Sequence, residues 1–338
     1  MRIAINGFGR IGRVFFRQAF GHKSIDIVAV NDLGSVDNLA YLLKYDSVYG
    51  RYAKEVGHKT SDEHHLVVDG KEVRFFQEKD PSKLPWKELK IDVVVESTGV
   101  FASYEKAKPH LDAGAKRVVI TAPAKDNGES KTFTPNVGAT FAADGPITSN
   151  ASCTTNAATP VMAVMMQNPG IEKAVLTTVH GYTATQGLVD GPTSGRDMRR
   201  GRAAAVNIVP SSTGAADAVE KAIPSIKGKF DGISLRVPIV SGSLVDFTFI
   251  ASRKTSVEEI NDIFRKASAK PEWSGILKVT EEPLVSTDIV GDPHGSIVDP
   301  SLTRVVDGNL VKVMSWYDNE WGYGAMLLKH IENLKNYL

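Results

Sequence analysis

Short apolar runs alternate with segments of helical periodicity through the first 150 residues. Residues 2–5 form an apolar run that ends at Asn6-Gly7, and apolar side chains then recur at helical spacing from Ile11 to Phe16. Further strands are expected at residues 25–30, 91–95, 118–120 and 146–147, and a helix at residues 38–44. Strands that alternate with helices predict parallel βαβ units and therefore an α/β domain.

Residues 57–90 interrupt this alternation. They are richer in His, Lys, Asp and Glu, and Asp69-Gly70 predicts a hairpin within them. We interpret this segment as a surface insertion.

After about residue 150 the apolar runs become longer and richer in β-branched residues. Strands are expected at residues 174–179, 233–240, 243–250 and 310–317, and helices at residues 257–267 and about 324–337. Thr255 or Ser256 is expected to cap the first of these helices. Long strands with few crossovers predict a second, α+β domain with a mainly antiparallel sheet. Residues 187–202, rich in Gly, Ser, Arg and Pro, predict a long loop of the kind that often carries function.

The composition narrows the class of partner. The 338 residues are 42% hydrophobic and 23% charged, as in ordinary globular proteins, and the length suggests about two domains. A formal net charge of +1 gives no reason to expect nucleic acid or an anionic membrane as the main partner. No segment approaches the roughly 18 apolar residues that a membrane helix needs. Because a single cysteine forms no intramolecular disulfide, we expect a cytoplasmic protein. The near-zero net charge instead favours small molecules as partners, and we expect no metal site.

Gly7, Gly9 and Gly12 form a G-x-G-x-x-G pattern between the first expected strand and the first expected helix. Such glycines permit a tight turn and close approach of the backbone to a pyrophosphate, which the N–H groups of the helix then bind. Asp32 follows about 20 residues later, at the end of the second strand, where a carboxylate accepts hydrogen bonds from ribose hydroxyls and repels a 2′-phosphate. The pattern therefore predicts dinucleotide binding, with NAD favoured over NADP.

Cys153 is the one cysteine, and its neighbours are polar. An isolated cysteine is most often a small buried core residue, but Ser, Thr and Asn surround this one. It precedes a helical run at residues 157–166, so a place in the first turn would favour the thiolate and lower the pKa of Cys153. From these residues alone, a nucleophile and a structural cysteine are about equally favoured.

A nucleophilic cysteine needs a base or a cationic partner. His180 ends the apolar strand at residues 174–179 and begins a turn, which suits a side chain presented at a sheet edge, although a histidine in that place is often only structural. Most of the other histidines lie in polar stretches and are expected to be exposed, namely His22, His58, His64, His65 and His110.

Ten motifs extend this picture through nearly the whole chain. They are NGFGRIGR (6–13), ND (31–32), ESTGVF (96–101), TAPAKD (121–126), SNASCTTN (149–156), TTVHGYTATQ (177–186), RRGRAAA (199–205), NIVPSSTGAA (207–216), RVP (236–238) and SWYDNEWGYG (315–324). In sequence and order these motifs resemble those of phosphorylating glyceraldehyde-3-phosphate dehydrogenases.

The resemblance implies an NAD-binding Rossmann domain at residues 1–150, to which a C-terminal helix at about 319–338 returns, and a catalytic domain at residues 151–318. It also implies a homotetramer in which the loop at about 182–205 packs near a neighbouring subunit's cofactor site. The implied reaction converts glyceraldehyde 3-phosphate, inorganic phosphate and NAD through a cysteine thiohemiacetal and a thioester. Thioester chemistry suits a cysteine, because phosphate attacks a thioester more readily than an oxygen ester.

Residue roles follow from the resemblance, motif by motif. Cys153 is the implied nucleophile and His180 its partner. The implied substrate and phosphate sites comprise Ser152, Thr154, Thr183, Arg200, Thr213, Gly214 and Arg236. The implied NAD site comprises Asn6, Gly7, Gly9, Arg10, Ile11, Gly12, Asp32, Thr98, Thr121 and Asn319.

Some positions depart from common forms of the family, and other functions stay open. Ala157 stands where many members have a second cysteine, Asp217 adds a negative charge near Thr213 and Gly214, and Gly181 suggests local backbone freedom after His180. One alternative is an erythrose-4-phosphate dehydrogenase, in which water resolves the thioester. Another is a nucleotide- or RNA-binding protein with secondary catalysis, to which the basic stretch at residues 199–202 would contribute.

Overall fold

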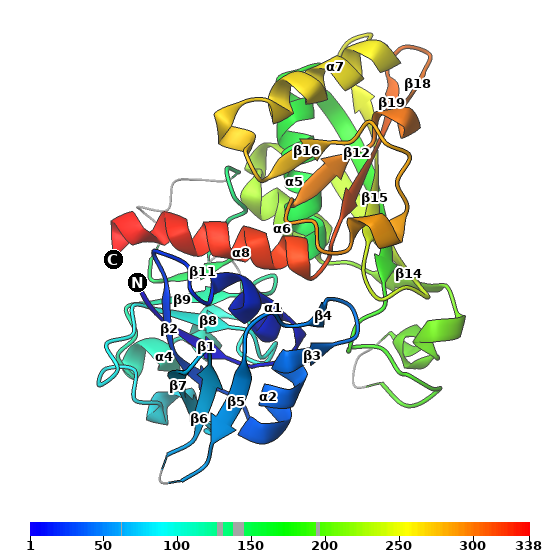
Figure 1. Ribbon diagram of the computed structural model, residues 1–338. Coiled ribbons are helices and arrows are strands. Elements are labelled where there is room, and N and C mark those ends of the chain that lie inside the picture. Colours follow the sequence, from blue (N-terminus) through cyan, green and yellow to red (C-terminus); the bar gives the residue numbers. More distant parts are fainter. Residues whose placement is uncertain (62, 127–130, 138–144, 194–196) are drawn as a thin grey trace. The chain divides into compact units, whose positions relative to one another are not determined.

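The computed structural model describes residues 1–61, 63–126, 131–137, 145–193 and 197–338 (Figure 1). The chain divides into two compact units. The first unit contains the described residues of Met1–Phe133, Ala139–Ala151 and Leu327–Leu338, and the second those of Thr134–Gly138 and Ser152–Met326. Each unit has its own large sheet and its own hydrophobic core.

Among the described residues, nine strands form the sheet of the first unit in the order β10-β11-β9-β8-β1-β2-β7-β6-β5. Their bounds are β1 (Arg2–Asn6), β2 (Asp26–Asn31), β5 (Val56–Lys59), β6 (His65–Val68), β7 (Lys71–Phe76), β8 (Val93–Glu96), β9 (Arg117–Ile120), β10 (Lys131–Thr132) and β11 (Ile147–Ser149). All neighbours from β10 to β7 are parallel, so the predicted βαβ arrangement is confirmed. The helices of this unit include α1 (Arg10–Ala19), α2 (Val36–Lys44), α3 (Tyr104–Ala107) and α4 (Pro109–Asp112), and a small separate ladder pairs β3 (Tyr45–Asp46) with β4 (Gly50–Arg51).

The central strands are apolar on both faces because helices or loops cover both faces of a parallel sheet. Ile3, Ala4 and Ile5 of β1 are all fully buried. Ile3 and Ile5 belong to the core cluster that contains Phe15 of α1, whereas Ala4 belongs to a cluster on the other side. This double burial explains why these strands appear in the sequence as continuous apolar runs.

The interpretation of residues 57–90 as a surface insertion is wrong. Strand β7 pairs in parallel with β2, and β6 and β5 continue the sheet in antiparallel pairing. Val68, Val73 and Trp86 are completely buried. The predicted hairpin is confirmed, since Asp69 and Gly70 join β6 to β7 with positive φ angles of 47° and 76°. Charged residues face outward from an edge of the sheet, and these hid its buried face in the sequence.

The second unit contains a mixed sheet in the order β13-β14-β12-β15-β19-β17-β16, with β18 paired to β19. The bounds are β12 (Ile171–Gly181), β13 (Val209–Ser212), β14 (Phe230–Val237), β15 (Ser243–Ala251), β16 (Leu277–Val279), β17 (Ser296–Val298), β18 (Arg304–Val306) and β19 (Leu310–Tyr317). Only the pairs β12–β14 and β16–β17 are parallel among the described strands of this sheet. The mainly antiparallel sheet is therefore confirmed.

Helices cover one face of this sheet. Residues of α5 (Cys153–Gln167), α6 (Ala215–Ala222) and α7 (Val257–Ser268) share one core cluster with the inward residues of β15 and β19. Strand β15 alternates strictly between buried and partly exposed positions, as expected for a sheet with one covered face. Ser256 caps α7, because its hydroxyl accepts a 3.2 Å hydrogen bond from the Glu259 N–H. The last helix, α8 (Trp321–Asn333), contains the boundary between the two units.

None of the helices within the described ranges combines the length and the apolar character that a membrane span requires.

His330 is a completely buried imidazole in the first unit. Its Nε2 lies 2.9 Å from the Thr148 hydroxyl, and its Nδ1 lies 3.2 Å from the Asn150 amide oxygen. Burial lowers the pKa of His330 to about 3, and a hydrogen bond with the backbone of Phe133 acts in the opposite direction. The imidazole is therefore neutral in the folded protein at neutral pH.

We predict that His330 makes the protein sensitive to acid. Between pH 6.5 and 3 the unfolded chain binds a proton at this position and the folded chain does not, so stability falls as the pH falls through this window. From pH 7.5 to pH 5.5 the free energy of unfolding should fall by about 1.4 kcal/mol more in the wild type than in His330→Gln, as measured by urea unfolding. Equal losses in the two proteins would contradict the assignment.

Candidate active site

The three glycines of the G-x-G-x-x-G turn differ in what a side chain would meet at each position. Gly7 has a φ of +93°, and a Cβ there would lie 2.6 Å from the backbone nitrogen of Thr98. A Cβ on Gly12 would lie 2.2 Å from the Gly7 carbonyl oxygen. A Cβ on Gly9 would meet nothing within 4 Å. Gly7 and Gly12 are therefore required by the fold, whereas Gly9 keeps open the space before the N-terminus of α1, and the N-terminus of a helix favours an anion.

Asp32 holds this turn from the neighbouring strand end. Its carboxylate accepts hydrogen bonds from the N–H groups of Phe8 (2.6 Å) and Gly34 (2.8 Å). A carboxylate has about four acceptor positions, so it retains capacity for hydroxyl donors from a ligand. Asp32 is thus bound to the glycine-rich turn through the Phe8 N–H.

A buried polar network lies at the ends of β1 and β8. The Asn6 amide donates to Glu96 Oε2 (2.5 Å), and His110 Nε2 lies 3.0 Å from the same oxygen. Trp86 donates its indole N–H to His110 Nδ1, so Nδ1 must accept and Nε2 carries the proton. Asn31 completes the network by donating to the Asn6 amide oxygen.

This network corrects one expectation and refines another. His110, which was expected to be exposed, is completely buried because Trp86 and Glu96 occupy both of its ring nitrogens. Asn6 is 1% exposed, and its side chain is hydrogen-bonded to Glu96 and Asn31, so it supports the strand end that precedes the glycine-rich turn.

The other residues expected to bind NAD each make contacts within the protein. Arg10 forms an ion pair with Asp46 (2.6 Å), and Ile11 packs against the core. The N–H and hydroxyl of Thr98 both donate to Glu96, and the N–H of Thr121 donates to the Glu96 carbonyl oxygen. All of these lie in the first unit, whereas Asn319 belongs to the second.

Cys153 is the first residue of α5 in the second unit. Ser152 caps the helix, because its hydroxyl accepts a 3.1 Å hydrogen bond from the Thr155 N–H. Cys153 Sγ lies 3.3 Å from Nε2 of His180, which stands near the end of β12. The structure thus brings together the two residues that sequence spacing alone could not join.

Arg236 completes this cluster because β14 runs beside β12 and its register places Arg236 opposite His180. Arg236 Nη1 lies 2.6 Å from His180 Nδ1 and 3.2 Å from the Gly181 carbonyl oxygen. The same carbonyl oxygen lies 2.6 Å from His180 Nδ1. Since a guanidinium only donates, Nδ1 either accepts from Arg236 or donates to Gly181; the second arrangement leaves Nε2 free to accept the thiol proton.

The expected lowering of the Cys153 pKa is not found. Burial raises the pKa of this thiol and outweighs the lowering by the Arg236 charge and by hydrogen bonding to Thr154. Burial and the positive charge of Arg236 also lower the pKa of His180 to about 3. The free pair therefore rests as thiol and neutral imidazole at neutral pH.

The remaining residues expected to bind substrate lie in the same unit, Thr154 in α5 and Arg200 in a short 3-10 helix at Met198–Gly201. Arg200 is held by the Ser211 hydroxyl (2.9 Å) and the Ser212 carbonyl oxygen (3.2 Å), and its charge contributes to lowering the pKa of His180. The Thr154 hydroxyl lies 3.0 Å from the Tyr317 hydroxyl.

Thr183 follows β12, while Thr213 and Gly214 lie between β13 and α6. The Thr183 hydroxyl lies 2.9 Å from that of Thr185, and the Thr213 hydroxyl accepts from the Ala215 N–H at 3.1 Å. Among the described residues, no hydrogen bond joins Thr183, Thr213 or Gly214 directly to Cys153.

Gly181 meets a steric requirement, which corrects the expectation of local backbone freedom. A Cβ there would lie 2.8 Å from the Val240 carbonyl oxygen and 3.0 Å from that of Ile239. The chain after His180 is thus packed closely against the loop between β14 and β15.

A dinucleotide-binding α/β unit and a second unit with a paired cysteine and histidine define the class of an NAD-dependent oxidoreductase that acts through a thiol. Comparison with known proteins is more specific. Residues 1–104 match the model of the glyceraldehyde 3-phosphate dehydrogenase NAD binding domain, and residues 152–319 match that of the C-terminal domain of the same enzyme. The chain belongs to the glyceraldehyde 3-phosphate dehydrogenase family.

Curated relatives cover nearly the whole chain. The chain is 49% identical to the glyceraldehyde-3-phosphate dehydrogenase of Thermotoga maritima over 336 residues, which is 98% of each protein. It is 49% identical to that of Borreliella burgdorferi over 341 residues, or 99% of each. It is 48% identical to glyceraldehyde-3-phosphate dehydrogenase 1 of Saccharomyces cerevisiae over 334 residues, or 98% of each. Neither alternative, the erythrose-4-phosphate enzyme or the nucleic-acid-binding protein, is favoured by these matches.

Several supporting residues were missed by the sequence analysis. Glu96 and Asn31 each end a parallel strand, as His180 nearly ends β12, so a polar residue closing an apolar run was the available signal. Tyr317, Ser241 and Ser243 gave no such signal, because their partners are distant in sequence.

We predict that alanine substitutions separate the two roles of the turn glycines. Gly7→Ala should lower the free energy of unfolding by about 2 kcal/mol or more, because the new Cβ meets backbone at a positive φ. Gly9→Ala should change it by less than about 0.5 kcal/mol but raise the Kd of NAD roughly tenfold or more, because it fills space kept for a phosphate. Urea unfolding and titration calorimetry measure the two effects. Unchanged NAD affinity in Gly9→Ala would contradict this assignment.

Proposed function

We propose that this chain is the phosphorylating, NAD-dependent glyceraldehyde-3-phosphate dehydrogenase of glycolysis and gluconeogenesis. It oxidises D-glyceraldehyde 3-phosphate to 1,3-bisphosphoglycerate with inorganic phosphate as the acyl acceptor. The observation that carries this proposal is the 3.3 Å contact between Cys153 Sγ and His180 Nε2, beside the guanidinium of Arg236. A thiol, a base and a fixed positive charge are the groups that this reaction needs in one place.

Cys153 is the nucleophile and His180 its base. The thiol proton passes from Sγ to Nε2, and the sulfur attacks the aldehyde carbon to form a C–S bond. His180 returns a proton to the aldehyde oxygen, which gives a thiohemiacetal on Cys153. Gly181 supports this sequence because its carbonyl oxygen stabilises the doubly protonated ring through Nδ1–H.

Oxidation then produces a thioester on the same sulfur. His180 Nε2 takes the hydroxyl proton of the thiohemiacetal as a hydride leaves the former aldehyde carbon. NAD supplies the acceptor for that hydride. An oxygen of inorganic phosphate attacks the thioester carbon, the C–S bond breaks, and Cys153 leaves as a thiolate with the acyl phosphate as product.

Anion binding would reduce the repulsion between the two nearby guanidiniums and a protonated His180. Arg236 and Arg200 both lower the pKa of His180, so the free site disfavours the imidazolium. A substrate phosphate held by Thr183, Arg200 and Arg236 would neutralise part of that charge and so reduce its opposition to a proton on His180. Arginine forks suit such a dianion because they donate two parallel hydrogen bonds.

The second anion site is assigned to Ser152, Thr154, Thr213 and Gly214. Their hydroxyl and backbone groups lie at or beside the N-termini of α5 and α6, where partial positive charge favours inorganic phosphate. Asp217 lies in the first turn of α6 and opposes this attraction.

NAD is assigned to the residues of the first unit described above, with Asn319 contributing from the second. Gly9 fits a pyrophosphate by the space that it leaves, Gly7 and Gly12 permit the tight turn, and Asp32 fits an unphosphorylated ribose. We assign NAD binding to residues 1–150 with the returning C-terminal helix, and the chemistry to residues 151–318. A cytoplasmic location is proposed because the reaction needs the free thiol of Cys153.

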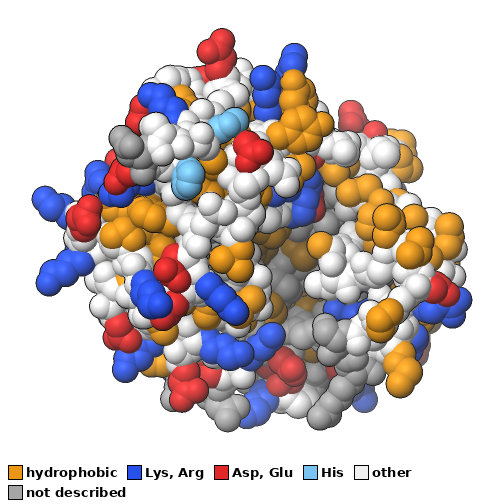
Figure 2. Space-filling view, turned by 90° about the horizontal axis from the view of Figure 1, so that it is seen from below, with side chains coloured by type: hydrophobic (Ala, Val, Ile, Leu, Met, Phe, Trp, Pro, Cys, Tyr) orange, Lys and Arg blue, Asp and Glu red, His pale blue; other side chains and the backbone are white. Residues whose placement is uncertain are grey.

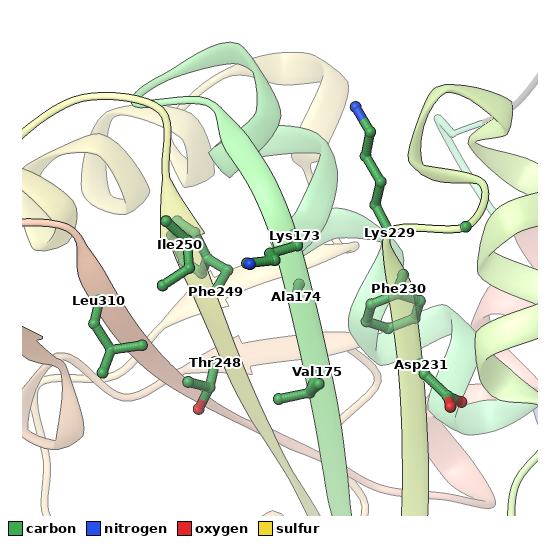
Figure 3. A pocket seen from close by; sticks show the side chains of 11 residues that line it. Lys173, Ala174, Val175, Lys229, Phe230, Asp231, Thr248, Phe249, Ile250 and Leu310 are labelled. Atoms are coloured by element: carbon green, nitrogen blue, oxygen red, sulfur yellow. The ribbon is translucent and has the colours of Figure 1, made fainter.

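A homotetramer is part of this proposal. Large hydrophobic side chains are exposed at Leu188, Val189, Met198, Val206 and Ile208, and none is less than 68% exposed. Hydrophobic side chains gather on the right of Figure 2, the side on which Figure 1 shows the segment after β12. The exposed end of the sheet in the second unit forms a shallow pocket lined by Val175, Thr248 and Leu310 among others (Figure 3). Further copies of the chain would cover such surfaces, and light scattering that gives the mass of one chain would contradict this.

We predict that turnover depends on inorganic phosphate. NADH should form continuously from glyceraldehyde 3-phosphate and NAD only when phosphate is present, and erythrose 4-phosphate should be a much poorer substrate. Cys153→Ser should lower kcat roughly 10⁴-fold or more, while NAD binding, measured by calorimetry, shows that the variant is folded. Continuous NADH formation without phosphate would instead favour the hydrolytic alternative.

A further inference from the structure

The orientation of the Asn319 amide is determined by two serines. Asn319 is 4% exposed and lies between β19 and α8. The Ser243 hydroxyl donates to Asn319 Oδ1 at 2.7 Å, and the Ser241 hydroxyl lies 3.3 Å from the same oxygen. Ser241 has a closer acceptor in Asp318 Oδ1, at 2.7 Å, so Ser243 is the main donor to the amide oxygen.

The hydrogen bonds of Ser243 favour this orientation of the Asn319 amide over the reversed one. Its oxygen accepts a 3.1 Å hydrogen bond from the Gly181 N–H, and its side chain is fully buried. If the Asn319 amide were reversed, its NH₂ would donate to Ser243 and the Ser243 proton would have no acceptor in the contacts described. A buried hydroxyl without an acceptor is unfavourable.

The amide nitrogen of Asn319 is available to donate a hydrogen bond to a ligand. Among the described residues, Asn319 Nδ2 has no hydrogen-bond partner, whereas Oδ1 is fully engaged. Asn319 therefore presents a donor and no acceptor. A ligand group at this place must accept, and in a nicotinamide ring that group is the carboxamide oxygen.

We propose that Ser243 is a positioning residue that fixes Asn319 as a hydrogen-bond donor to the carboxamide oxygen of NAD. The inference rests on the role that the proposed function gives Asn319. Ser243 selects the rotation of the carboxamide without touching the cofactor.

The same hydroxyl links this donor to the catalytic base. Ser243 holds the N–H of Gly181, and the carbonyl oxygen of Gly181 contacts Nδ1 of His180. Close packing of Gly181 against Val240 leaves little room for the segment to shift. One serine thus positions both the group that orients the ring and the backbone that orients the imidazole.

The test compares Ser243→Ala with Ser234→Ala. Ser234 is a matched control, because it is a buried serine of the same sheet whose hydroxyl has no partner among the described residues. Calorimetry on the full chain measures the Kd of NAD and of 3-acetylpyridine adenine dinucleotide, a methyl ketone that keeps the ring's carbonyl oxygen but lacks its NH₂.

Ser243→Ala should raise the Kd of NAD roughly 3- to 10-fold, the effect of one hydrogen bond, and Ser234→Ala should leave it unchanged. The Kd of the methyl ketone should rise several-fold more than that of NAD, because a reversed Asn319 still accepts from a carboxamide NH₂ but finds no donor in a methyl ketone. A purely structural role would weaken both ligands equally, and that result would overturn the proposal.

A second variant keeps the test decisive if Ser243→Ala does not fold. Asn319→Asp replaces the donor with an acceptor and should raise the Kd of NAD by roughly 30-fold or more. NAD affinity equal to that of the wild type would overturn the donor assignment. Because these are binding measurements, they remain valid if the wild type binds NAD but forms no NADH from glyceraldehyde 3-phosphate, a result that would refute only the proposed function.

Discussion

A partly buried thiol beside a buried imidazole stays uncharged unless its surroundings stabilise the separated charges. At Cys153 and His180, burial raises the first pKa and lowers the second, so both groups rest in their neutral forms. The N-terminus of α5 and the charge of Arg236 favour the thiolate, but Arg236 also opposes the imidazolium. Arg236 therefore acts in opposite directions on the two partners: it stabilises a charged sulfur and destabilises a charged imidazole.

In both units the candidate functional groups lie at or near the ends of strands. Apolar strands end in polar residues, and these residues are held by buried hydrogen bonds rather than by solvent. In the first unit Asn6, Asn31 and Glu96 end β1, β2 and β8 and join in one network below the glycine-rich turn. In the second unit His180 near the end of β12 and Arg236 on β14 are adjacent because of the parallel register. A packed sheet keeps such groups fixed, which catalysis by orientation requires.

Local patterns in the sequence carried much of this information. The apolar runs predicted the strands, and the glycine spacing predicted a tight turn. The sequence left Thr255 and Ser256 open as the cap of α7, and the structure shows Ser256 in that place. The segment at residues 57–90 was misjudged because an edge strand with a charged outer face has a weak apolar signal. Contacts between distant residues were beyond local patterns: the burial of His110, the pairing of Ser243 with Asn319 and the position of Arg236 beside His180 arise only in the folded sheets. The Cys153 pKa was misjudged for the same reason, because its burial depends on packing across the whole unit.

The central claim is that oxidation takes place while the substrate is bonded to Cys153. The most direct measurement mixes the protein with glyceraldehyde 3-phosphate and NAD in the absence of phosphate, quenches with acid, and locates the acyl group by mass spectrometry of the peptides. The account predicts that the Cys153 peptide gains the mass of the acyl group, that no other peptide does, and that adding phosphate before the quench removes it. NADH formation in the same mixture with an unmodified Cys153 would contradict the account.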